Sequence, residues 1–156
     1  MVIGKEEGRI GLGAVIRDHN GNLLAARSVT KIGIIEPIAA EAMAAILAFQ
    51  LSSELGVSNV WLEGDANMIV KAVESTEVNW SHTGHLIDDI RTILRRFPRW
   101  RISHVGREFN QAAYGLARLA KMQSIDRLWR TDYPECIRGI LIAEKSAMLS
   151  GGPDNE

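Results

Sequence analysis

Residues 9–16 alternate between two faces, the period of two that is typical of a β-strand. The apolar face carries Ile10, Leu12, Ala14 and Ile16. Asp18-His19-Asn20-Gly21 then predicts a tight turn, because Asn-Gly tolerates the positive φ angles of a type I′ hairpin. Residues 22–30 return as the partner strand. Gly11 and Gly13 let a ligand or another backbone approach closely, or they mark a bulge or tight packing.

A helical period replaces this alternation after Pro37, which suits the first turn of a helix, and Gly56 offers a C-cap. The apolar residues at helical spacing are Ile38, Ala42, Ala45 and Phe49. Glu41 lies one position off this stripe, among small alanines that let the helix lie close to a sheet. It is either a solvated glutamate or a carboxylate held near the boundary of the core.

The stretch from Gly56 to Val70 places one acidic residue, Asp65, where a strand runs into a helix. Residues 57–62 are apolar and β-branched or aromatic, which predicts a buried strand. Asp65 can serve as the N-cap of a helix over residues 66–73. Alternatively, a carboxylate at the C-terminal end of a strand faces the crevice where α/β sheets bind ligands. Both interpretations stand on this segment alone.

Further elements follow in the second half of the chain. The pattern predicts a helix over residues 83–96 that Pro98 ends, a strand over 100–105, and a helix that Asn110 caps. A terminal helix is expected over residues 134–145. Residues 1–145 therefore read as one domain, and residues 146–156 as a disordered tail.

Composition narrows the class of protein. The 156 residues are 46% hydrophobic and 24% charged, the profile of a globular chain. No apolar run approaches about 20 residues and no signal sequence opens the chain, so we expect an intracellular protein, nuclear or cytoplasmic, without a membrane partner. The lone Cys136 fits a reducing compartment. Because the net charge is −1, nucleic acid could be held only by a local basic patch.

One such patch follows the predicted helix over residues 83–96 and the strand after it. Its candidate members are Arg91, Arg95, Arg99 and Trp100. Basic residues beside aromatic rings can hold a phosphate backbone while bases stack. The alternative is an ordinary solvated helix face, which Asp88 and Asp89 dilute.

The ordered set of motifs resembles the ribonuclease H type-1 family, and more narrowly its plant reverse-transcriptase-like branch. The matching stretches are Gly-Leu-Gly-Ala-Val-Ile-Arg-Asp-His-Asn-Gly at 11–21, Ala-Glu-Ala-Met-Ala-Ala at 40–45, Leu-Glu-Gly-Asp-Ala at 62–66, His-Val-Gly-Arg-Glu-Phe-Asn at 104–110 and Leu-Ala-Arg-Leu-Ala at 116–120. The resemblance implies an α/β fold, a ribonuclease H-like mixed five-stranded sheet flanked by helices. Its first, central strand would be truncated here.

The resemblance also implies an endonuclease that cuts the RNA strand of an RNA–DNA hybrid with two Mg²⁺ (or Mn²⁺) ions held by four carboxylates. Glu41 matches the family's acid on the first helix, and Asp65 matches the acid that ends the fourth strand. The resemblance therefore favours the ligand interpretation of both residues. His104 aligns by count with a histidine that assists product release in some members, or it is only a strand residue.

Two family positions depart from the pattern. The family's late acid, counted from Asn110, falls on Tyr114, and a phenol is uncharged near neutral pH and a poor Mg²⁺ ligand. The first acid would fall at or before Met1. The chain is thus either a hybrid endonuclease with an impaired metal site or an inactive module that binds nucleic acid, hybrid or RNA, or another protein. A truncated central strand would also leave sheet edges open to self-association.

Overall fold

The computed structural model describes residues 2–4, 8–33, 35–64, 67–74, 82–106, 108, 110–124 and 126–150. Six strands and five α-helices lie in this part of the chain, with one short 3₁₀ helix. In chain order they are β1 (Val2–Gly4), β2 (Arg9–Arg17), β3 (Leu23–Ile32), α1 (Pro37–Glu54), β4 (Asn59–Gly64), α2 (Asn67–Glu74), α3 (His82–Leu94), β5 (Arg99–His104), α4 (Gln111–Gln123), β6 (Arg127–Trp129), η2 (Glu135–Ile137) and α5 (Arg138–Ser150).

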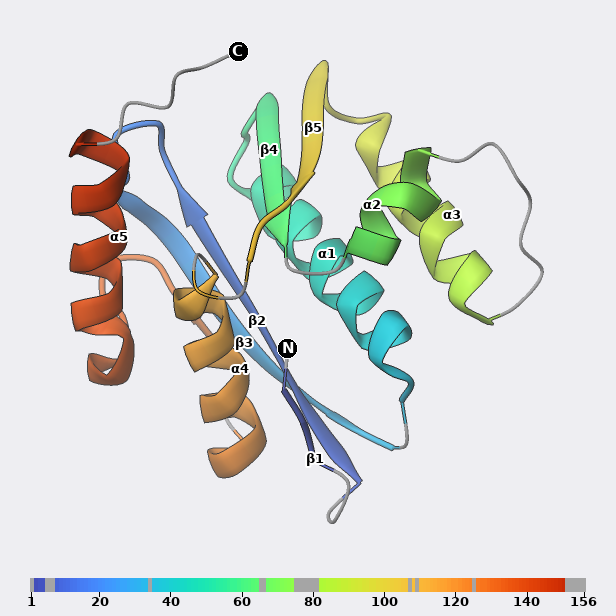
Figure 1. Ribbon diagram of the computed structural model, residues 1–156, viewed down its shortest axis with the longest axis horizontal. Coiled ribbons are helices and arrows are strands. Elements are labelled where there is room, and N and C mark those ends of the chain that lie inside the picture. Colours follow the sequence, from blue (N-terminus) through green and yellow to red (C-terminus); the bar gives the residue numbers. More distant parts are fainter. Residues whose placement is uncertain are drawn as a thin grey trace.

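The strands form two sheets (Figure 1). One is antiparallel with the order β1-β2-β3-β6, and the other is the parallel pair β4-β5. The α/β class with flanking helices is confirmed, but the single mixed sheet is not seen among the described residues. The physical reason is the short reach of β1, whose three residues pair with Arg9–Gly11 at the start of β2.

The two glycines of β2 admit a helix backbone. A Cβ built on Gly13 would lie 2.8 Å from the Ala117 nitrogen and 2.9 Å from the Leu116 Cβ, with the Ala113 carbonyl oxygen closer still. At Gly11 the nearest backbone atoms belong to Ala117 and Lys121, again on α4. Of the interpretations open from the sequence, tight packing against another backbone is therefore the observed one.

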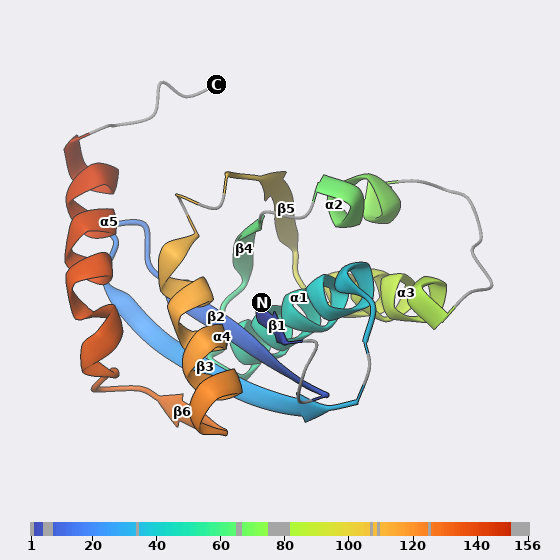
Figure 2. The same cartoon turned by 60° about the horizontal axis from the view of Figure 1, so that its bottom comes forward.

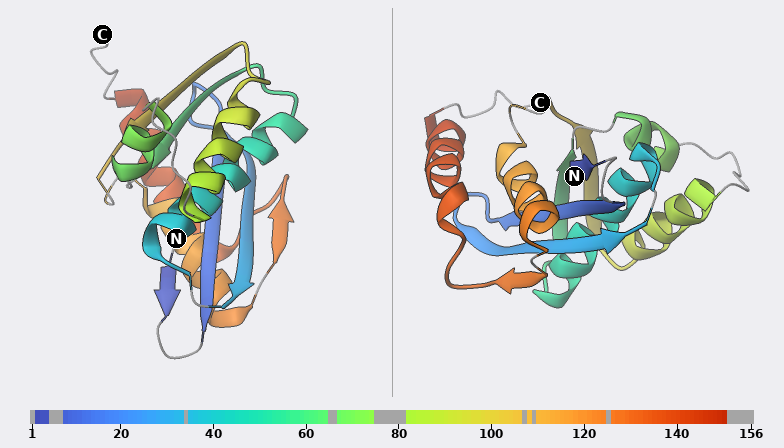
Figure 3. Two further views of the ribbon diagram at one scale, coloured as in Figure 1. Left: turned by 90° about the vertical axis from the view of Figure 1, so that its right-hand side faces the viewer. Right: turned by 90° about the horizontal axis from the view of Figure 1, so that it is seen from below.

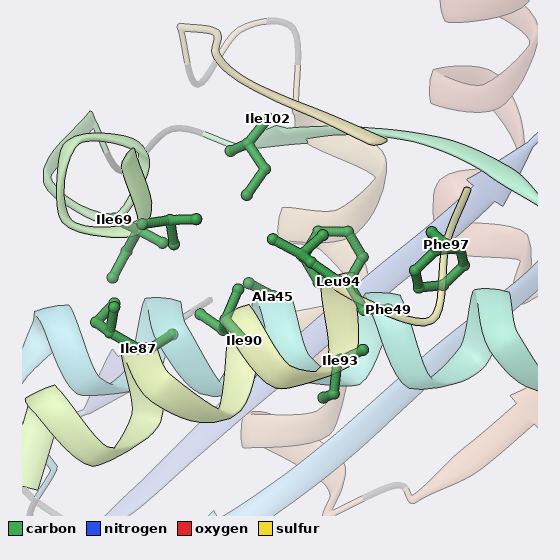
Figure 4. Close-up of a cluster of buried hydrophobic side chains, with 11 residues drawn as sticks. Ala45, Phe49, Ile69, Ile87, Ile90, Ile93, Leu94, Phe97 and Ile102 are labelled. Atoms are coloured by element: carbon green, nitrogen blue, oxygen red, sulfur yellow. The ribbon is translucent and has the colours of Figure 1, made fainter. Parts of the chain in front are cut away.

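Helix α1 covers the opposite face of the hairpin. Ala40 is fully buried against Ile10, Leu12 and Val29 of β2 and β3. Since successive side chains of a strand point to opposite faces, α4 and α1 enclose the hairpin between them. A second cluster joins α1 to α2, α3 and the β4–β5 pair, with Phe49 and Phe97 rings 6.0 Å apart (Figure 4).

The β2–β3 turn differs from the predicted type. Gly21 has a positive φ of 81°, but Asn20 does not, so the type I′ turn is wrong. The Asp18 carboxylate instead accepts hydrogen bonds from the backbone nitrogens of Asn20 and Asn22, at 2.9 Å each. The backbone bond from Asn22 is the main cause that lowers the pKa of Asp18 below its usual value. The Asn-Gly signal therefore located the turn, while Asp18 sets its geometry.

The C-terminal segment adds elements that the sequence did not predict in full. The strand β6 pairs with the edge of β3, and η2 and α5 follow it. Trp129 and Ile137 are buried with Leu116 of α4 in a third cluster. The helix continues to Ser150, past the predicted domain boundary at residue 145. Figure 3 shows α5 at the far end of the hairpin from α2 and α3.

Candidate functional site

The carboxyl ends of β4 and β5 meet at one place because the two strands run parallel. Gly64 pairs in register with His104, and the Val105 nitrogen donates to the Gly64 carbonyl oxygen at 2.9 Å. Figures 1 and 2 show these strand ends lying between α4 on one side and α1 with α2 on the other. Five elements, β4, β5, α1, α2 and α4, thus lie around these strand ends.

Glu41 lies early in α1, on the inner face of the helix. Residues four, seven and eleven positions on share a helix face with it, and they are Ala45, Ala48 and Ser52. All three are buried, and Ser52 is only 1% exposed, whereas Glu41 itself is half-buried. Because Ala40 packs on the hairpin and Ala42 on the other cluster, this stripe turns towards the junction of the two sheets. A carboxylate on this face is not part of an ordinary solvated helix surface.

Asp65, the central candidate of the sequence, lies outside the described residues. Gly64 ends β4 and α2 begins at Asn67, so the predicted strand-to-helix junction is present on both sides of it. Its assignment as a metal ligand stays a prediction.

Tyr114 occupies the first turns of α4 and is half-buried. Its backbone is fixed by the close approach of Ala113 and Ala117 to β2. The residue borders a groove of about 500 Å³ that α4 forms with the C-terminal segment, where Cys136 and Ile140 are the facing residues. Tyr114 and Glu41 therefore lie on helices that cover opposite faces of the hairpin. That they adjoin stays a prediction.

The described residues, which do not include Asp65, hold only part of a donor set for two divalent ions. No group of three or more His, Cys, Asp or Glu side chains gathers anywhere in this part of the chain. Glu41 is a carboxylate, Tyr114 is a phenol, and Mg²⁺ is held in proteins chiefly by carboxylates and waters. The missing donor is visible in the sequence itself, as the phenol at position 114.

Two residues, one at the end of β5 and one in the loop after it, complete the surroundings. His104 is exposed at the end of β5, beside Gly64. Glu108 is also exposed, and its carboxylate folds over Gly106, since a Cβ built there would lie 2.5 Å from it. The sequence reasoning gave Glu108 no role, although it is the acid of the Arg-Glu-Phe-Asn motif.

In the predicted basic patch, Arg91 forms an ion pair and a hydrogen bond within the protein, whereas the other three residues are exposed to solvent. Arg91 is half-buried, pairs with Asp88 at 3.1 Å and donates to the Val73 carbonyl at 3.4 Å, so it ties α3 to α2. Arg95 and Arg99 are exposed, and Trp100 is 44% exposed. Their role in binding stays a prediction.

The sequence reasoning missed Trp61. Residues 57–62 were expected to form a buried strand, but the side chains of β4 alternate between exposed and half-buried, and Trp61 is 53% exposed. Since β4 and β5 are covered by helices on one face, their other face carries exposed residues. The sequence did carry a signal for an exposed face, because the polar residues Asn59 and Glu63 lie two positions either side of Trp61. The apolar residues between them made the whole segment look buried.

Comparison with known proteins identifies a matching protein family and two similar solved structures. The family model described as reverse transcriptase-like matches residues 2–120. The structure is similar to ribonuclease H1 of the halophilic archaeon Halobacterium salinarum, with a TM-score of 0.70 and 26% identity over 76% of this chain and 90% of that one. It is also similar to an N-terminal ribonuclease H domain from Mycobacterium tuberculosis, solved as a fusion with maltose binding protein. That likeness has a TM-score of 0.61 and 16% identity, covering 76% of this chain and 96% of the other.

These likenesses confirm the predicted ribonuclease H-like fold. No curated protein matches the chain. Among the described helices, none is long and apolar enough to span a membrane. The segment after residue 120, which includes β6 and α5, lies beyond the family match.

Proposed function

The chain belongs to the reverse transcriptase-like family, and from this premise we propose that it binds RNA–DNA hybrids at the carboxyl ends of β4 and β5 and cleaves them weakly. The observation that carries the proposal is the inward face of α1, where Glu41 shares a stripe with the buried Ala48 and Ser52. A half-buried carboxylate that turns towards a strand end suits a divalent ion more than a solvated surface. The likeness to a ribonuclease H1 at 26% identity supports the hybrid as substrate.

Glu41 and Asp65 are the residues that would hold Mg²⁺ or Mn²⁺. A divalent ion bound there supplies a Lewis acid and an activated water. The chain's own contribution is to set Glu41 on a helix packed against both sheets, while β4 ends at Gly64, the residue before Asp65 in the sequence.

Weak cleavage follows from Tyr114. A phenol stands where the family has a carboxylate, so the site lacks one of the groups that would hold and neutralise a second ion. Phosphate-backbone binding needs only basic and polar contacts and survives this loss. The second candidate function, an inactive module that binds nucleic acid or another protein, is favoured by the same residue and differs in having no cleavage at all.

The test uses a labelled blunt-ended RNA–DNA hybrid. We expect binding by fluorescence anisotropy and little cleavage in Mg²⁺ or Mn²⁺. Tyr114→Asp should raise cleavage by at least about tenfold, which corresponds to about 1.4 kcal/mol of transition-state stabilisation. Tyr114→Phe is the matched control and should stay at the parent level, and Glu41→Gln should remove the gain of Tyr114→Asp.

The outcomes separate the candidates. A parent chain that cleaves strongly, and loses this activity in Glu41→Gln, would show that the metal site is complete without Tyr114. No cleavage in the parent or in Tyr114→Asp, with hybrid binding intact, would establish the inactive module. A folded chain that binds no hybrid would refute the proposal.

A further inference from the structure

We propose that the outer face of the β4–β5 pair is a second nucleic-acid contact, a stacking platform for a single-stranded segment of RNA or DNA. The platform consists of Asn59, Trp61, Arg99, Arg101 and Ser103. It goes beyond the hybrid site at the strand ends and does not depend on Glu41, Asp65 or a metal ion.

The register of the strands puts these residues on one surface. Asn59 pairs with Arg99, Trp61 with Arg101, and Glu63 with Ser103. Side chains two positions apart point to the same face, so the pairs form three successive rows. The alternate residues Val60, Leu62 and Ile102 pack into the core on the other face.

The Trp61 ring is held in position while it stays accessible. Its Nε1 donates to the Ser103 hydroxyl oxygen at 2.6 Å, and the Arg101 guanidinium lies 4.5 Å from the ring centroid. The side chain nevertheless remains 53% exposed. The Arg101 guanidinium lies over the indole ring, so the two groups form one stacked, partly exposed unit to which a base can add.

Charge selects an anionic strand as the occupant. Arg99 and Arg101 lie in the first rows of the platform, and Arg95 and Arg96 lie in the turn between α3 and β5. No ion pair within the described residues engages these four guanidinium groups. Since the whole chain carries a net charge of −1, this is a local concentration of positive charge. Glu63, the acid of the same face, lies in the last row, towards Gly64.

A shallow hollow marks the basic end of the platform. It measures about 230 Å³ and is lined by Asn59, Val60, Trp61, Arg99, Trp100 and Arg101. Trp100 pairs with Val60 in an alternate row, so its side chain belongs to the opposite face and Trp61 is the indole of the platform. A peptide of acidic residues would use the charges but leave the exposed Trp61 indole unused, whereas a strand with bases and phosphates uses both the charges and the ring. The hollow lies roughly 17 Å along the strands from Gly64, so a single-stranded flank of a bound duplex could reach it.

The experiment measures anisotropy of a labelled single-stranded oligonucleotide of about 12 nucleotides at low salt. We expect Trp61→Ala and Arg101→Gln each to weaken binding by about fivefold or more, the lower limit for one base–aromatic stack. Arg127→Gln is the matched control. Arg127 also lies over a tryptophan, at 5.5 Å, but the ring of Trp129 is only 4% exposed and offers no surface for stacking. This variant should bind as the parent does.

Three results would overturn the inference: no oligonucleotide binding by the parent chain, unchanged binding in Trp61→Ala, or an equal loss in Arg127→Gln. Displacement by poly-glutamate as effective as displacement by unlabelled oligonucleotide would also refute it, and would assign the face to an acidic polypeptide. The blunt hybrid is titrated in parallel. Loss of oligonucleotide binding in Trp61→Ala with hybrid binding absent throughout refutes the proposed function and supports this inference. Hybrid binding without oligonucleotide binding refutes this inference and supports the proposed function.

Discussion

At the scale of single residues, Gly13 decides whether α4 can dock on the hairpin. A methyl group there would meet the backbone of Ala113 and Ala117, which cannot turn aside as a flexible side chain can. We expect Gly13→Ala to lower the free energy of unfolding by about 1–3 kcal/mol, the range for overpacked cores. The measurement is urea denaturation followed by circular dichroism.

Gly139 supplies the control for this substitution. It lies in α5, and a Cβ built on it would meet no atom within 4 Å. Gly139→Ala should leave stability unchanged or raise it slightly, because alanine is the better helix former. If both variants unfold at the parent midpoint, α4 is free to shift away from β2 and the close packing carries little of the stability.

At the scale of elements, Glu144 links α5 to two others. Its carboxylate pairs with Arg17 of β2 and accepts from the Ala112 nitrogen, at 3.4 Å, in the first turn of α4. Asn110 makes no side-chain cap, so the predicted Asn110 cap is replaced by an acid from α5, a favourable charge at a helix N-terminus. We expect Glu144→Gln to destabilise by about 1–2 kcal/mol, since both interactions are charge-assisted and partly buried.

The exposed pair of Arg138 with Glu135 is the comparison. These side chains are 59% and 83% exposed, so Glu135→Gln should change stability by less than about 0.5 kcal/mol. Equal effects of the two substitutions in thermal melts would mean that α5 rests on the hairpin without holding α4.

The elements that sequence patterns predicted well are those with long periodic runs. The helix from Pro37 and the helix after Asn110 were located correctly, because each carries several turns of apolar spacing. β6 was missed since three residues carry no period, and its pairing with β3 depends on a contact about 100 positions away in sequence. Tertiary pairing of this kind leaves no local signal.

The candidate site was predictable in its chemistry more than in its geometry. The phenol at position 114 is visible in the sequence, and so is the carboxylate of Glu41. For the face of α1 that Glu41 occupies, the sequence left two alternatives, solvent or the boundary of the core, because the stripe with Ala48 and Ser52 is made of small residues that a hydrophobic period scarcely registers. Trp61 was misjudged for a related reason, since an indole counts as apolar whether or not a helix covers it.

At the scale of the whole molecule, α1 is the element that joins the two sheets. Its Ala40 side packs on β2 and β3, and its Phe49 side packs with α3 and with Ile102 of β5. Within the described residues no backbone ladder connects the sheets, so side-chain packing on this helix connects them. Such a chain should unfold as one cooperative unit only if α1 keeps its packing contacts with both sheets.

Ala40→Leu tests this directly. The added carbons would enter a fully buried site between α1, Ile10 and Leu12 and should destabilise by about 1–3 kcal/mol. If α1 couples the sheets, amide hydrogen exchange should quicken in β4 as well as in β2, although no residue of β4 belongs to the apolar cluster around Ala40. Ala143→Leu, on the exposed side of α5, should alter neither. Faster exchange confined to β2 and β3 would show that the two sheets open independently, and that α1 serves the hairpin alone.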